Sequence, residues 1–183
     1  MCIRDRARTP IGAFQGEFSA LSASDLGKIA VEAAVSRAGL APADIEEVLM
    51  GCVLQAGQGQ APARQAARKA GLPDSVPATT INKMCGSGMK AAMLAHDNLL
   101  AGAANIMVAG GMESMTNAPY LLEKARGGLR MGHGKIMDHM FLDGLEDAYD
   151  KGQLMGVFAD ETARSCQITR EDQDNFALAS LSR

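Results

Sequence analysis

The chain contains no tryptophan, few other aromatic residues and no block of basic residues. Aromatic residues make up 4% of its 183 residues, and 18 Lys and Arg stand against 21 Asp and Glu, giving a net charge of −3. Proteins that bind nucleic acid present clustered Lys and Arg, often with aromatic side chains on which bases stack. A nucleic-acid partner is therefore not expected.

Long apolar segments are missing as well. No apolar run approaches the roughly 18 residues that a membrane-spanning helix needs, and the initial "MCIRDRARTP" lacks the apolar stretch of a secretory signal. We therefore expect no membrane association and a cytoplasmic location.

The cysteines show no Cys-x-x-Cys spacing, and only three histidines accompany the four of them. Such a pattern predicts neither a metal site nor a disulfide framework. We expect free thiols in a reducing compartment, at Cys2, Cys52, Cys85 and Cys166. Cys52 and Cys166 have no setting that suggests chemistry, so we interpret them as structural.

What the chain does have is an alternation of helix-like and strand-like segments. Helices are expected at 22–39, 62–72 and 87–101, buried strands at 47–54 and 105–111, and a further strand at 79–84. This order predicts parallel strands in a layered α/β fold. Residues 116–156 are rich in Gly and charge and predict an irregular excursion with short helices. A capped helix should then begin at Thr169, which stands three residues before Asp172.

Cys85 lies between a predicted strand and a predicted helix, with Gly86 and Gly88 on its far side. Ligand sites of open α/β sheets lie at the carboxyl ends of strands, and the partial positive charge of a helix start favours a thiolate. The alternative is a small buried hydrophobe at a turn that the glycines make possible. From local context both interpretations stay open.

A general base cannot be assigned from the sequence. His96 is eleven residues beyond Cys85, which places it about 16 Å along the helix axis and out of reach. His133 and His139 fall in the irregular segment, where we expect solvated surface side chains. A competing signal, Gly57-x-Gly59 after a strand, resembles dinucleotide loops only weakly, because Pro62 replaces the third glycine.

Several motifs in series resemble the thiolase family. "RTPIGAFQG" (8–16) resembles the N-terminal signature of that family, "NKMCGSGMKA" (82–91) its active-cysteine motif, and "VAGGMESMTNAPYLL" (108–122) the stretch after its active-site helix. "GCVLQAGQGQAPARQAA", "MDHMFLDGLEDAYDKGQLMG" and "TREDQDNFALAS" also have family counterparts. The resemblance runs from about Ala7 to Ser180.

This resemblance implies the layered αβαβα thiolase fold, of which the chain would hold the N-terminal half. Residues 1–115 would form the incomplete N-terminal α/β domain, and 116–183 the start of an inserted loop domain that receives CoA and helps build tetramers. The implied activity is that of an acetyl-CoA C-acetyltransferase. It uses coenzyme A thioesters as substrates and no further cofactor, and the parent would be a homo-oligomer.

In residue terms, the resemblance implies that Cys85 attacks an acyl-CoA and carries the acyl group. Leu145 and Met155 match positions that line the CoA and acyl pocket, although plain packing of the loop is the alternative. Many biosynthetic members have a histidine where this chain has Leu154. A non-catalytic assembly half and a degradative 3-ketoacyl-CoA thiolase remain alternative functions.

The motifs of the family's second half are not in this chain. These are a Gly-His-Pro histidine, a Cys-x-Gly cysteine and a water-ordering asparagine, whereas His133 stands in Gly-His-Gly. We expect a truncated reading frame that is inactive on its own, with apolar sheet edges that favour aggregation or pairing with another thiolase-like chain.

Overall fold

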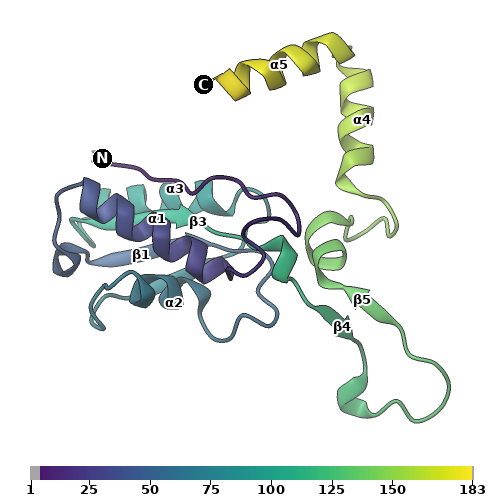
Figure 1. The fold of residues 1–183 in the computed structure, drawn as a ribbon, viewed down its shortest axis with the longest axis horizontal. Helices are drawn as coiled ribbons and strands as arrows, with labels where there is room; N and C mark the ends of the chain where they lie inside the picture. The colour runs from purple at the N-terminus through teal and green to yellow at the C-terminus, as the bar shows by residue number, and fades with distance from the viewer. Residues whose placement is uncertain (1–4, 183) are drawn as a thin grey trace. The chain divides into compact units, whose positions relative to one another are not determined.

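The computed structural model describes residues 5–182. These residues divide into two compact units, with the division between Met140 and Phe141 (Figure 1). Each unit is described by itself below. The expected domain boundary at residues 115 and 116 concerns the complete protein and stays a prediction.

A parallel sheet of three strands forms the centre of the first unit (Figure 1). Strand β1 (Glu47–Gly51) lies between β2 (Ala78–Ile81) and β3 (Met107–Gly111). In the register of the sheet, Val48 stands opposite both Ala78 and Val108. The apolar run of β1 is explained by this central place, because a central strand between helical layers is buried on both faces.

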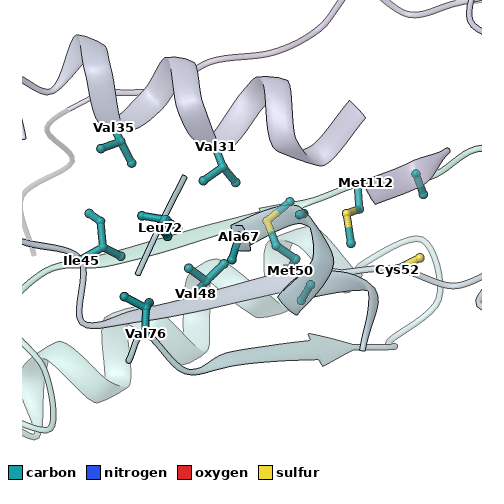
Figure 2. Close-up of a cluster of buried hydrophobic side chains, with 13 residues drawn as sticks. Val31, Val35, Ile45, Val48, Met50, Cys52, Ala67, Leu72, Val76 and Met112 are labelled. Carbon is teal, nitrogen blue, oxygen red and sulfur yellow. The ribbon is translucent and has the colours of Figure 1, made fainter. Parts of the chain in front are cut away.

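Helices cover both faces of the sheet, and the alternation of β1 side chains shows which helix covers which face. Val48, Met50 and Cys52 share a core with α1 (Ala23–Arg37) and α2 (Pro62–Lys69), as Figure 2 shows. Leu49 points to the other face and packs with Ala91 and Ala95 of α3 (Ser87–Leu100). The described part of the chain therefore confirms the α/β class, with one sheet between two helical layers.

The helix starts follow their sequence signals closely. Ser22 caps α1, and the Asp25 carboxylate accepts a hydrogen bond from the Ser22 backbone N–H in return. Pro62 begins α2, where its missing N–H costs nothing. Lys69 and Ser22 lower the pKa of Asp25 to about 2, because both donate hydrogen bonds to the charged carboxylate.

Two strands end earlier than the sequence pattern predicts. The expected strand 47–54 ends at Gly51, and the expected strand 79–84 ends at Ile81. Beyond Gly51 the backbone N–H groups of Val53 and Leu54 donate to the side chain of Glu113 instead of a neighbouring strand. The carboxylate of Glu113, about sixty residues further along the chain, therefore takes the place of strand-to-strand hydrogen bonds at this point.

Residues 112–140 complete the first unit with short elements. An antiparallel pair is formed by β4 (Tyr120–Leu122) and β5 (Ile136–Asp138). Single 3₁₀ turns occur within this stretch at Met115–Asn117 and Ala125–Gly127, and another lies earlier in the unit at Pro42–Asp44. The expectation of an irregular segment is correct, although the antiparallel pair was not foreseen.

The second unit contains a short π-helix, η4 (Phe141–Leu145), followed by α4 (Met155–Ser165) and α5 (Arg170–Ser182). Thr169 caps α5 as predicted, since its hydroxyl accepts from the Asp172 backbone N–H. No residue of α4 or α5 is buried. Among the described residues, none of the helices is long and apolar enough to cross a membrane.

Candidate active site

Three glycines bring the start of α3 directly against the ends of two strands. A Cβ placed on Gly51, the last residue of β1, would lie 2.6 Å from the Cβ of Ser87. A Cβ on Gly111, which ends β3, would lie 3.3 Å from the Cα of Gly88. A side chain at Gly51 would force α3 to shift and one at Gly111 would be tight, so these glycines allow the close approach of the helix start to the strands.

The turn between β2 and α3 carries Cys85. Met84 adopts φ +49°, a left-handed conformation that is rare for a side chain other than glycine. Ser87 supports this turn from inside the helix. Its hydroxyl accepts from the Lys83 backbone N–H at 2.8 Å and donates to the Met84 carbonyl at 2.5 Å. The turn leaves the Cys85 side chain exposed two residues before α3 begins.

Cys85 lines a hollow of about 440 Å³ at the carboxyl edge of the sheet. The wall comes from the ends of β1 and β3 and from the start of α3, namely Gly51, Cys52, Val53, Met84, Ser87, Gly88, Gly111, Met112 and Glu113. Of the described residues in this wall, only Glu113 carries a charged side chain. This location agrees with the expectation that Cys85 stands between a strand and a helix and is open to a ligand.

Cys52 lines the same hollow but has opposite properties. It is 1% exposed, and burial followed by the charge of Glu113 raises the pKa of its thiol to about 12. A thiol with such a pKa stays protonated at neutral pH, and this agrees with a structural role. Cys166 is exposed at the C-terminal end of α4, and Cys2 lies outside the described residues.

The histidines are dispersed. His96 lies on α3 with its ring 3.3 Å from the Asp97 carboxylate, and His133 is exposed. The expectation of a solvated His139 is wrong. This residue is 5% exposed, and its Nε2 accepts a hydrogen bond from the Ala56 backbone N–H at 3.3 Å. None of these histidines belongs to the wall of the hollow.

Leu145 and Met155 both belong to the second unit, on either side of a loop. Glu146 and Leu154 form an antiparallel bridge, which brings the flanking Leu145 and Met155 to neighbouring positions. Further hydrogen bonds support this closure, from Asp147 N–H to the Gln153 carbonyl and from Gly152 N–H to the Glu146 carboxylate. Their role in substrate binding stays a prediction.

Sequence reasoning missed two residues of the site, Glu113 and Ser87. Glu113 stands two residues after the end of β3, and an acidic side chain just beyond an apolar parallel strand was the signal that could have found it. The expectation that this strand is buried is wrong, because β3 lies at the edge of the sheet and none of its residues is buried. Ser87 gives no such signal, because its capping-like role depends on the turn itself. Among the described residues, no three His, Cys, Asp or Glu side chains are grouped to hold a metal ion.

These features define an α/β protein with an exposed thiol at the carboxyl edge of a parallel sheet. Comparison with known proteins agrees with the α/β class and also identifies the family. The family model described as "Thiolase, N-terminal domain" matches residues 1–183. The chain belongs to the thiolase family.

Relatives with curated names agree with the family. The chain is similar to "Acetyl-CoA acetyltransferase B, mitochondrial" of Xenopus laevis, with 54% identity over 181 residues, which is 99% of this chain and 42% of the relative. "Acetyl-CoA acetyltransferase IB" of Candida tropicalis is 52% identical over 178 residues, 97% of this chain and 44% of the relative. "Acetyl-CoA acetyltransferase" of Cupriavidus necator is 51% identical over 177 residues, 97% of this chain and 45% of the relative. The chain thus spans less than half the length of these relatives.

Proposed function

We propose that the protein is the N-terminal part of an acetyl-CoA C-acetyltransferase in which Cys85 is the acylated nucleophile. The observation that carries this proposal is the exposed thiol at the start of α3, in a hollow bounded by the carboxyl ends of β1 and β3. Membership of the thiolase family and the names of the relatives support the same activity.

The first step would be attack of the Cys85 sulfur on the carbonyl carbon of an acyl-CoA. A new carbon–sulfur bond forms to Cys85, the bond to the CoA sulfur breaks, and CoA leaves with the proton that the cysteine gives up. In the second step another acetyl-CoA loses an α proton, and its enolate carbon forms a bond to the acyl carbonyl carbon. The bond from that carbon to the Cys85 sulfur breaks, and the released thiolate takes up a proton in place of the one removed from acetyl-CoA. Covalent catalysis divides one difficult condensation into two easier steps.

Backbone geometry supports Cys85 in a second role. Its own N–H stands two residues before α3, next to the N-cap Gly86, on the side where the helix dipole is positive. This N–H would donate to the oxygen of the thioester as negative charge develops there. The glycines at 86 and 88 leave room beside the sulfur for the acyl group.

Proton transfer needs a base, and no histidine lines the hollow. Loss of a general base costs about 10²-fold or more in rate, so we expect acylation of this chain to be slow and complete turnover to be negligible. Leu145 and Met155 would contact the CoA or its acyl group. The complete parent would be a cytoplasmic tetramer that needs CoA thioesters and no other cofactor.

Mass spectrometry of the intact chain and its peptides after incubation with acetyl-CoA tests the proposal. We expect one acetyl group, located on Cys85 and absent from Cys85→Ala. Cys166 is a matched control within the same chain, because it is also exposed but lies at the C-terminal end of α4 and does not line the hollow. Equal acetylation of Cys85 and Cys166 would indicate unspecific chemistry.

An assembly role without catalysis is the second candidate. It is favoured by the exposed apolar side chains of α3, Met89, Met93 and Leu100, which are 74%, 52% and 69% exposed. A chain that takes no acetyl group on Cys85 but forms a defined complex with another thiolase-like chain would support this role. Acetoacetyl-CoA thiolysis by the pure chain would exclude the assembly role without catalysis and would contradict the expectation that turnover by this chain is negligible. A degradative 3-ketoacyl-CoA thiolase would prefer longer acyl groups. Comparing the rates of Cys85 acylation by acetyl-CoA and by a long-chain acyl-CoA would distinguish it from the proposed acetyltransferase.

A further inference from the structure

Glu113 binds three consecutive residues of a loop that lies far from it in the sequence. Its carboxylate accepts from the backbone N–H of Val53 at 2.8 Å and from that of Leu54 at 3.1 Å. The Cys52 thiol also donates to it, with 3.5 Å between sulfur and oxygen. The three donors are the first three residues after β1, and Glu113 is the second residue after β3.

The Glu113 carboxylate links the segments after β1 and β3 beyond the last backbone hydrogen bonds of the sheet. The Met112 N–H donates to the Gly51 carbonyl, and the Cys52 N–H donates to the Ile81 carbonyl, both at 2.9 Å. Beyond these points the strands end and no ladder partner follows. The side chain of Glu113 takes over there and holds residues 52–54 against the end of β3.

The chemistry of a carboxylate suits this task better than that of an amide. An ionised carboxylate only accepts hydrogen bonds, so both oxygens can face N–H and S–H donors. A glutamine would direct an NH₂ group at one of those donors. Hydrogen bonds to a charged acceptor are roughly twice as strong as neutral ones.

Cys52, Val53 and Glu113 all line the hollow that contains Cys85. We propose that Glu113 is a positioning residue: it holds residues 52–54 as one wall of this hollow and so fixes the space in which an acyl group on Cys85 must fit. The same contacts keep the Cys52 thiol buried and out of reach of electrophiles. The role of this wall in shaping an acyl site rests on the proposed acyl transfer. The fixing of residues 52–54 by Glu113 does not depend on it.

Two reactions of the same chain test this inference. Iodoacetamide is small and needs only an accessible thiolate, so its rates at Cys52 and Cys85, measured separately on peptides by mass spectrometry, report the state of the loop. Transfer of acetyl from acetyl-CoA to Cys85 reports the shape of the hollow. The variants are Glu113→Gln, Glu113→Asp and, as a matched control, Glu123→Gln, whose side chain is exposed after β4.

In Glu113→Gln we expect alkylation of Cys52 to rise about tenfold, which corresponds to loss of one charged hydrogen bond. Alkylation of Cys85 should stay within about twofold, while its acetylation falls about tenfold. Glu113→Asp should restore part of both effects, because it keeps the charge and the two oxygens. Glu123→Gln should react like the unaltered chain.

A purely structural role predicts a different pattern. Both cysteines would then become reactive together, in step with a lowered melting temperature, and the ratio of acetylation to alkylation at Cys85 would not move. That pattern, or a Cys52 that stays protected in Glu113→Gln, would overturn the inference. If Glu113→Gln does not fold, the ratio of acetylation to alkylation at Cys85 in Glu113→Asp tests the inference instead. If the unaltered chain takes no acetyl group but Cys52 still becomes reactive in Glu113→Gln, the proposed function fails and the holding of the wall stands.

Discussion

The two units differ in how their helices are stabilised. Helix α3 of the first unit and helix α5 of the second have similar lengths, with 14 and 13 residues. Ala91 and Ala95 of α3 are buried against the sheet, whereas Phe176 and Leu181 of α5 are 72% and 86% exposed. Tertiary packing therefore supports α3, and capping with local pairs supports α5.

The difference teaches where a substitution can have a large effect. In the first unit, side chains of the sheet exclude water together with α1 and α2 on one face and with α3 on the other. In the second, the ordered features are local, such as the Thr169 cap and the Arg170–Asp174 ion pair. A change in the first unit is felt by the whole core, while a change in the second is felt mainly by one helix turn.

The largest expected effect is that of a buried charge. Val48 is fully buried in the central strand, and Val48→Asp should abolish cooperative unfolding, since an unpaired buried carboxylate costs more than the about 5–15 kcal/mol of stability that a domain has. Phe176→Asp on α5 should change the free energy of unfolding by about 0.5 kcal/mol or less. Thermal and urea unfolding followed by circular dichroism measure both. Equal losses would show that α5 belongs to the same core.

A smaller effect is expected at the glycines. Gly51→Ala puts a Cβ 2.6 Å from Ser87 main-chain and side-chain atoms, so the start of α3 must shift, at a cost of about 1–3 kcal/mol. Gly156→Ala in α4 meets no atom within 4 Å and replaces a poor helix former, which should be neutral or stabilise by up to about 1 kcal/mol. Urea unfolding gives the free energies. Alkylation of Cys85 should change in Gly51→Ala alone.

The smallest effect concerns pH. The pKa of Asp25 is lowered from 3.8 to about 2, so its contribution is present above pH 4 and is lost as pH falls from about 4 to about 2. Its side chain is 36% exposed, so after screening by solvent the contribution should be about 1 kcal/mol or less. Asp25→Asn should lower stability at pH 7 and flatten its dependence in that window.

Asp172 provides the counterpart in the second unit. The hydroxyl and N–H of Thr169 lower the pKa of this exposed carboxyl. Because only one helix start depends on it, Asp172→Asn should leave the cooperative unfolding of the first unit unchanged at every pH. A flattened acid limb in this variant would contradict the contrast between the two units. Urea titrations at pH 7 and pH 3 measure both aspartates.

The sequence was most informative where structure is local. The alternation of apolar runs with capped helices predicted the parallel sheet, and the Ser22 and Thr169 signals predicted two helix starts. The same pattern placed Cys85 correctly between β2 and α3. These features depend on neighbouring residues, whose propensities act over a few positions.

Features that depend on distant partners could not be predicted in this way. The early end of β1 depends on Glu113, and the burial of His139 depends on the loop at Ala56. The left-handed Met84 is stabilised by Ser87 and Asn82, and nothing in the residue type methionine indicates it. Each of these needs knowledge of which segments meet in space.

The glycine contacts at Gly51 and Gly111 have one more consequence. Because a Cβ on Gly51 would lie 2.6 Å from Ser87, the start of α3 has no room to shift toward β1, and any residue larger than glycine there must push the helix away. Such a shift would reach Cys85, which stands two residues before α3. Protein engineers who seek thermostability should therefore begin with the layer of α1 and α2, which covers the opposite face of the sheet from α3.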